Sequence, residues 1–208
     1  AAKDAGLYFS DNKGNKSFDT KQWNAIKAWT TLSKDKAISR DQAENMYKYI
    51  RDLKDFDFRT PKFWQNVPET QTFTFKQLKE WAGLDLEDYE QTRPWWIILK
   101  RNFTPNQTQY FIRLLRAYGQ KTIDKDPQII IDTIHSVKGG EANNVLIYSK
   151  TNWPASFSHK TKDEQSDEKR VYYTGVTRAK NTLHILSTDY KYNYPIGKDY
   201  FMYLQEKK

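Results

Sequence analysis

The first 120 residues carry apolar side chains at intervals of three and four positions, which is the spacing of an amphipathic helix. Four segments show this pattern, and we expect a helix in each: residues 20–32, 40–53, 74–83 and 104–119. Ser39 and Thr74 are each followed three positions later by glutamine, which predicts a capping box at two helix starts. Pro105 suits the first turn of the fourth helix, and Gly119 suits its end.

Aromatic side chains dominate this helical half, since six of the seven tryptophans lie within residues 23–96. Each ring buries a large area, so a core can form here with few aliphatic residues. Residues 56–75 are aromatic without a clear period and predict packed loops with one short strand. The tryptophans expected to pack in the interior are Trp23, Trp29, Trp81, Trp95 and Trp96.

The pattern changes near residue 121, where continuous apolar runs rich in β-branched residues begin. Three such runs predict strands: residues 128–133, 144–149 and 183–187. The first has the composition of a strand covered on both faces. Residues 163–180 form a helical stretch that is acidic at its start and basic at its end, as the helix dipole favours. The predicted fold class is α/β: a mainly helical N-terminal half followed by part of a parallel-sheet domain.

Composition narrows the class of protein only a little further. The net charge is +8, which permits contact with nucleic acid without requiring it. The chain has no cysteine, and its three histidines lack metal-ligand spacing, so no metal site is predicted. No apolar run is long enough to span a membrane, and no signal peptide pattern is present, so a soluble cytoplasmic protein is expected. Because the chain begins with Ala-Ala-Lys, we expect it to be a fragment or a processed product.

Two short motifs carry the chemistry of the second half. The first reads Thr133-Ile-His-Ser-Val-Lys-Gly-Gly-Glu141 and follows the first predicted strand. Ligands of open α/β sheets bind where strands end, and the glycine pair allows the backbone to approach a ligand closely. The hydroxyl, imidazole and ammonium groups of this motif suit phosphate oxygens, and Glu141 suits a sugar hydroxyl. An ordinary solvated turn would explain the same residues.

The second motif, Arg170-Val-Tyr-Tyr-Thr-Gly-Val-Thr-Arg-Ala-Lys180, ends the predicted helix with basic residues. A guanidinium held rigidly at such a place can stabilise charge on a transferring phosphoryl group. The alternative is that these basic side chains only complement the helix dipole. The sequence contains no Gly-x-x-x-x-Gly-Lys-Ser/Thr phosphate loop and no acidic metal-binding pair after an upstream strand.

The two motifs resemble motifs V and VI of superfamily 1 helicases of the UvrD/Rep type. They occur in the family's order, and the resemblance covers roughly residues 128–187, with Val-Thr-Arg-Ala-Lys as its sharpest part. It implies that residues 121–208 are the C-terminal part of the second RecA-like domain, called 2A. It also implies that residues 1–120 are the helical insertion called 2B.

The resemblance also implies residue roles. Arg178 would be the catalytic arginine that reaches the γ-phosphate of ATP, Glu141 would contact the ribose, and Gly139 would belong to the same nucleotide site. Arg170 matches less well and is expected to pair with a carboxylate on its own helix. The positions expected to bind single-stranded DNA are Thr133, His135, Ser136 and Lys138.

An ATP-dependent DNA helicase or translocase of DNA repair or replication is therefore the leading interpretation. ATP and Mg²⁺ would serve the full-length enzyme, while this chain alone would bind neither tightly and would be inactive. The expected partners are single-stranded DNA, duplex junctions and the N-terminal RecA-like domain of the same protein. One alternative is a non-catalytic DNA- or protein-binding module with a helicase-derived fold. Another is a subunit whose motor is inactive and whose fold serves assembly.

Overall fold

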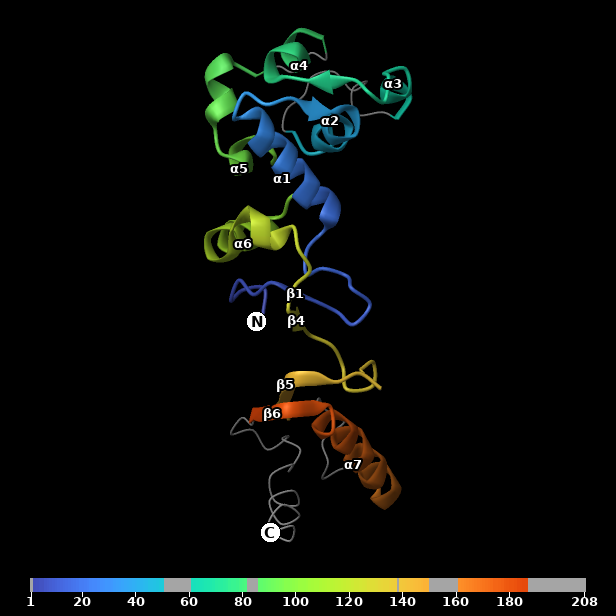
Figure 1. The fold of residues 1–208 in the computed structure, drawn as a ribbon. Helices are drawn as coiled ribbons and strands as arrows, with labels where there is room; N and C mark the ends of the chain where they lie inside the picture. The colour runs from blue at the N-terminus through green and yellow to red at the C-terminus, as the bar shows by residue number, and fades with distance from the viewer. Residues whose placement is uncertain (1, 51–60, 82–85, 138, 150–160, 187–208) are drawn as a thin grey trace. The chain divides into compact units, whose positions relative to one another are not determined.

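The computed structural model describes residues 2–50, 61–81, 86–137, 139–149 and 161–186 (Figure 1). The chain divides into two compact units, residues 1–130 and residues 131–208. The first unit is mainly helical, and the second contains a parallel pair of strands joined through a helix. The assignment of these units to the 2B and 2A domains stays a prediction.

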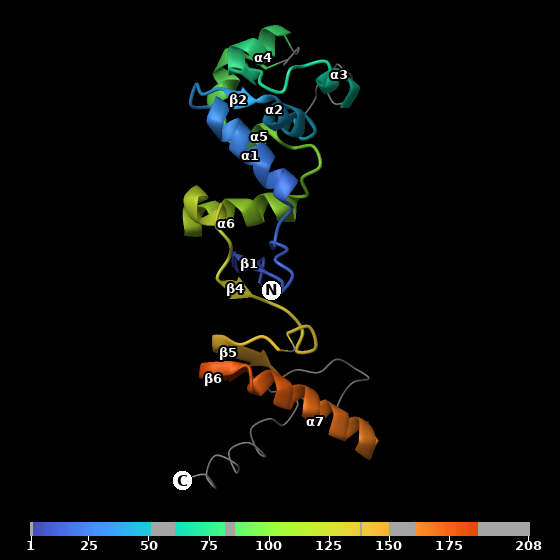
Figure 2. The same ribbon diagram turned by 45° about the vertical axis from the view of Figure 1, so that its right-hand side comes forward.

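Short helices and two-residue strands build the first unit (Figures 1 and 2). Its helices are α1 (Thr20–Leu32), α2 (Arg40–Tyr47), α3 (Pro61–Gln65), α4 (Phe75–Trp81), the 3-10 helix η2 (Asp88–Thr92), α5 (Trp95–Ile98) and α6 (Pro105–Ile123). Its strands are β1 (Phe9–Ser10), β2 (Ile38–Ser39), β3 (Thr72–Phe73) and β4 (Ile129–Ile130). Strand β2 pairs with β3 antiparallel, and β3 is the short strand predicted within residues 56–75.

Capping residues and glycine mark where helices of this unit begin and end. The Ser39 hydroxyl accepts from the Gln42 amide, and the Gln42 side chain accepts from Ser39 N–H, so the predicted capping box is formed. The backbone leaves the helical region at Gly119 (φ 70°), where the sequence predicts an end, but helical structure resumes as far as Ile123. Helix α2 ends at Tyr47, earlier than residue 53, and Gly83 lies outside the described residues.

Aromatic packing forms the core of the first unit, as predicted. Trp23 stacks on Phe111 with ring centroids 6.2 Å apart, and its indole donates a hydrogen bond to the Asp124 carboxylate. Trp29 is buried and donates to the Arg93 carbonyl. Trp95 is buried too.

The prediction that Trp96 packs inside is wrong, since 39% of this residue is exposed. Trp95 and Trp96 are neighbours on the single-turn helix α5, and consecutive helical residues point about 100° apart. A helix that buries Trp95 therefore turns Trp96 outward. The Trp81 side chain lies outside the described residues.

The prediction for residues 128–133 is also wrong in extent and burial. Only β4 forms there, and it pairs in parallel with the two-residue strand β1. Ile130 is 61% exposed, so this run is not covered on both faces. A partner of two residues can order only two residues opposite it. Because β1 lies in the first unit, β4 belongs to that unit, and the division of the chain follows residue 130.

The second unit contains the parallel α/β element that the sequence predicts, but its helix ends at Val176, before the predicted residue 180, and its last strand begins at Ala179. Strands β5 (Ala142–Tyr148) and β6 (Ala179–Leu186) run in parallel, and α7 (Lys162–Val176) lies between them in the chain and beside them in space (Figure 2). Buried Ile147 on β5 packs with Tyr172 on α7. This element is compatible with part of a RecA-like domain. In the described part of the chain, no helix has the length and apolarity to cross a membrane.

Candidate functional site

The segment that follows Ile131 folds into consecutive tight turns. The Thr133 carbonyl accepts from the Ser136 amide at 3.1 Å and from the Ser136 hydroxyl at 2.7 Å. The Thr133 hydroxyl accepts from the same amide at 3.3 Å, as a helix-capping threonine would. A second turn closes where the Gly140 amide donates to the Val137 carbonyl, and Gly139 takes φ +88° within it. Glycine is the residue that adopts this left-handed conformation at little cost.

Three of the residues predicted to bind DNA lie on the first of these turns. Thr133, His135 and Ser136 are all exposed. The hydroxyls of Thr133 and Ser136 are 3.2 Å apart, so the two side chains form one small polar surface. Lys138 lies outside the described residues. The turn therefore brings together three of the four predicted positions.

Arg178 lies between the end of α7 and the start of β6, and three contacts orient its guanidinium. Nε donates to the Thr174 carbonyl at 3.0 Å, Nη1 to the Gly140 carbonyl at 3.2 Å, and Nη2 to the Thr177 hydroxyl at 3.1 Å. The Arg178 carbonyl in turn accepts from the Ala142 amide at 3.0 Å. Main chain and side chain thus both join Arg178 to residues 140–142, although the two positions are far apart in sequence.

Glu141 lies at the same end of the strand pair as Arg178. The parallel register sets Ala142 opposite Ala179, so the residues just before each strand become neighbours. The Glu141 carboxylate pairs with the Lys180 ammonium at 3.1 Å, and both side chains are 54% exposed. Nothing in the sequence pattern pointed to a role for Lys180, because the contact depends on strand register.

Two cations and one carboxylate therefore meet at the start of β5 and β6, within reach of solvent. The net positive charge suits an anionic ligand, and the carboxylate suits a hydroxyl group of that ligand. Arg170 does not join this site. Its guanidinium pairs with Asp167 at 3.1 Å on its own helix, as the sequence leads one to expect.

Comparison with protein families places this chain in a known family. A family model described as the UvrD-like helicase C-terminal domain matches residues 15–190. The chain belongs to this family. It is the C-terminal region of a UvrD/Rep-like superfamily 1 helicase, as the two motifs indicate. Neither the comparison with curated proteins nor that with solved structures found a match.

The family match extends well beyond the two motifs. The sequence resemblance covers residues 128–187, whereas the family model also spans the helices of the first unit.

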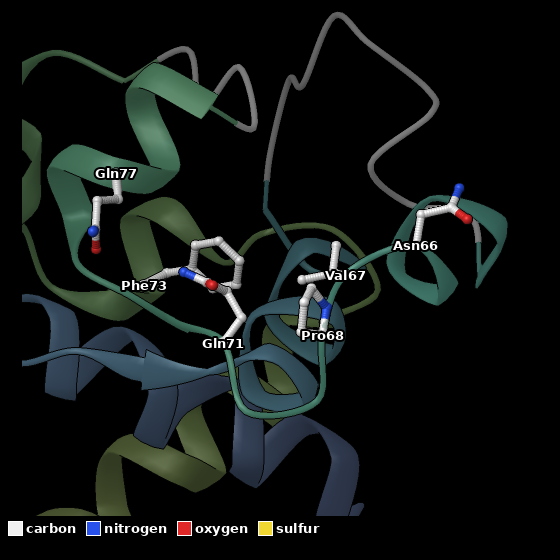
Figure 3. A pocket seen from close by; sticks show the side chains of 6 residues that line it. All are labelled: Asn66, Val67, Pro68, Gln71, Phe73 and Gln77. Atoms are coloured by element: carbon white, nitrogen blue, oxygen red, sulfur yellow. The ribbon is translucent and has the colours of Figure 1, made fainter.

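The first unit of the helicase domain also contains a cavity of about 400 Å³ beside β3 (Figure 3). Its lining residues are Asn66, Val67, Pro68, Gln71, Phe73 and Gln77. The Gln77 side chain already accepts from the Thr74 amide at 2.8 Å, and the Gln71 side chain donates to the Thr72 carbonyl. Both glutamine side chains that line the cavity thus already take part in hydrogen bonds with neighbouring backbone.

Proposed function

We propose that this chain is the part of an ATP-dependent DNA helicase or translocase that supplies the arginine finger and one side of the single-stranded DNA path. The observation that carries the proposal is the meeting of Arg178 with residues 140–141 at the start of β5 and β6. Two motifs separated along the chain form one site with charged groups suited to a nucleotide.

Arg178 is the proposed catalytic residue. Its guanidinium has five N–H groups, three of which are used in contacts with Thr174, Gly140 and Thr177. These contacts orient the planar group while it remains accessible. Such a group can stabilise the charge that develops on the γ-phosphoryl oxygens during hydrolysis.

Glu141 is the proposed ribose contact, and Gly139 lets the backbone turn beside the nucleotide. The ion pair between Glu141 and Lys180 is half exposed, so it contributes little stability and can be exchanged easily. A ribose hydroxyl could take the carboxylate as acceptor, and Lys180 would then face the anionic part of the ligand.

Thr133, His135, Ser136 and Lys138 form the proposed DNA contacts. Hydroxyl, imidazole and ammonium donors suit phosphate oxygens and carry no preference for base sequence, as a translocating enzyme requires. The expected partners are single-stranded DNA and duplex junctions. A cytoplasmic location belongs to the same proposal.

The groups that hold Mg²⁺ and the β-phosphate are proposed to lie in an N-terminal RecA-like domain outside these 208 residues. The sequence has no phosphate loop, so we expect the chain alone to bind ATP weakly and to show no ATPase activity. Robust ATP turnover by the purified 208-residue chain would contradict this division of labour.

The decisive experiment compares Arg178→Ala with Arg170→Ala in the longer polypeptide that includes the phosphate-loop domain. Both variants remove an arginine at or beside α7. The Arg170 guanidinium, however, pairs with Asp167 on its own helix and does not join the proposed nucleotide site. We expect Arg178→Ala to lower the DNA-stimulated kcat by about 10³-fold or more, with DNA affinity retained. Arg170→Ala should stay within about twofold of wild type. DNA binding without ATP turnover in the wild-type protein would instead favour the non-catalytic module.

A further inference from the structure

Helix α7 buries a glycine in its last turn, against the sheet. A Cβ atom added at Gly175 would lie 3.1 Å from Ile147 Cδ1 and 3.2 Å from Ile134 Cδ1. Both distances are shorter than an ordinary van der Waals contact between carbon atoms. A side chain at this position would therefore require the two isoleucine side chains to give way by a few tenths of an ångström.

Backbone conformation does not explain this glycine. The backbone of Gly175 does not have a positive φ, and the residue lies within the regular part of α7. Glycine is an unfavourable residue in the middle of a helix, because it loses the most backbone entropy on folding. The close packing on Ile134 and Ile147 is therefore the physical reason for a glycine here.

The same glycine is hydrogen-bonded to the catalytic arginine proposed above. The Gly175 carbonyl accepts from the Arg178 amide at 3.2 Å, and the preceding carbonyl, of Thr174, accepts from Arg178 Nε at 3.0 Å. The position of the guanidinium therefore depends on where the last turn of α7 lies.

Ile134, which packs against Gly175, belongs to the turn that carries the proposed DNA contacts. Ile134 packs against the cluster of Ile147 and Tyr172 and stands between Thr133 and His135 in the chain. The close packing of Gly175 on Ile134 thus links the last turn of α7, which accepts hydrogen bonds from Arg178, to the turn that carries these exposed side chains.

We propose that Gly175 is a positioning residue that seats the end of α7 on Ile134 and so couples the DNA-contacting turn to Arg178. A displacement of residues 133–137 on binding DNA is transmitted through Ile134 to Gly175 and from there to the guanidinium. The proposal rests on the function proposed above. It assigns the DNA stimulation of ATP hydrolysis to a defined packing contact.

The test places Gly175→Ala in two backgrounds of the polypeptide that includes the phosphate-loop domain. In the wild-type background, the added methyl group requires the two isoleucine side chains to give way by a few tenths of an ångström. We expect the DNA-stimulated kcat to fall about tenfold or more, since small displacements of catalytic groups are costly. KM for ATP and the affinity for a fluorescent oligo(dT) should change by less than about twofold. Ser166→Ala, on an exposed position of α7, is the matched control and should behave as wild type.

The second background is Ile134→Val with Ile147→Val, which removes the two Cδ1 atoms that a methyl group at Gly175 would meet. This loosened contact should lower the DNA-stimulated kcat about threefold. Adding Gly175→Ala should fill the space and return kcat to within about twofold of wild type. The same substitution is thus expected to lower kcat in one background and to raise it in the other.

The outcomes separate the coupling from the function on which it rests. A wild-type protein without DNA-stimulated ATPase activity would overturn the proposed function and the coupling with it. With an active wild type, a decrease of kcat by Gly175→Ala in both backgrounds, or no change in either, would overturn the coupling alone. If Gly175→Ala fails to fold in the wild-type background, the effect in the valine background still decides, because that background removes the two closest of the three atoms that the methyl group would meet.

Discussion

Replacing Arg178 with lysine keeps the positive charge and removes the guanidinium, so this variant separates charge from geometry. In the wild-type chain, three nitrogens of the guanidinium donate to three different acceptors. A lysine ammonium is a single donor atom on a flexible stem and cannot reproduce that planar fork. We expect the lysine charge to remain near the site without a fixed orientation.

The size of the effect follows from these contacts. An arginine finger contributes about 10³- to 10⁵-fold in kcat, which is about 4–7 kcal/mol of transition-state stabilisation. Lysine keeps the charge but loses about two oriented hydrogen bonds to charged groups, each worth about 1.5 kcal/mol or more. Arg178→Lys is therefore expected to lower kcat by about 10²- to 10³-fold, less than Arg178→Ala.

Folding should be almost unaffected by the same change. The contacts of Arg178 with Gly140 and Thr177 are exposed, and exposed contacts of a charged group contribute little to the free energy of unfolding. The assay is single-turnover ATP hydrolysis with saturating single-stranded DNA, together with thermal unfolding, in the polypeptide that includes the phosphate-loop domain. Arg170→Lys serves as the control. A kcat of Arg178→Lys within about threefold of wild type would refute the reasoning, as would a loss of activity that follows the unfolded fraction.

Three further predictions concern stability, binding and pH. Tyr8→Phe should lower the free energy of unfolding by about 1–2 kcal/mol in urea, because the buried hydroxyl donates to the carbonyls of Ile123 and Lys125; an unchanged midpoint would contradict this. Glu141→Gln should raise KM for ATP about three- to tenfold with kcat little changed, because a ribose contact binds the ground state and the transition state equally well. A fall in kcat alone would argue against a ribose contact. Burial raises the pKa of the Tyr47 hydroxyl, whereas the unfolded chain releases this proton near pH 10. The free energy of unfolding should therefore fall as the pH rises above about 10, and Tyr47→Phe should reduce that fall; identical pH profiles would exclude Tyr47 as its source.

Local features of this fold could be predicted from the sequence because their causes are local. The capping box at Ser39 depends on a side chain three residues away, and so does the one at Thr74. The aromatic core followed from helical spacing, as buried Trp23 and Trp29 show. Parallel pairing of β5 with β6 was predictable because both strands are apolar and a helix lies between them.

Features that depend on tertiary partners were beyond the sequence pattern. An isoleucine run such as residues 129–131 is apolar whether or not a sheet covers it, and its partner β1 is only two residues long. The pairing of Glu141 with Lys180 requires the register of two strands. The glycine at position 175 could be read as part of a motif, but its contacts with Ile134 and Ile147 appear only when helix and sheet are packed together.

The contacts that hold Arg178 and Glu141 in this chain bear on how the proposed enzyme would recruit them. Exposed contacts of this kind contribute about 0–1 kcal/mol each. Transition-state stabilisation by an arginine finger is several times larger, about 4–7 kcal/mol. In the proposed enzyme, a nucleotide would therefore draw Arg178 away from the Gly140 carbonyl at a small cost compared with the gain. Since Gly140 belongs to the same segment as the proposed DNA contacts, that exchange would also remove one of the contacts that hold this segment, and bound ATP would thereby affect the proposed DNA contacts.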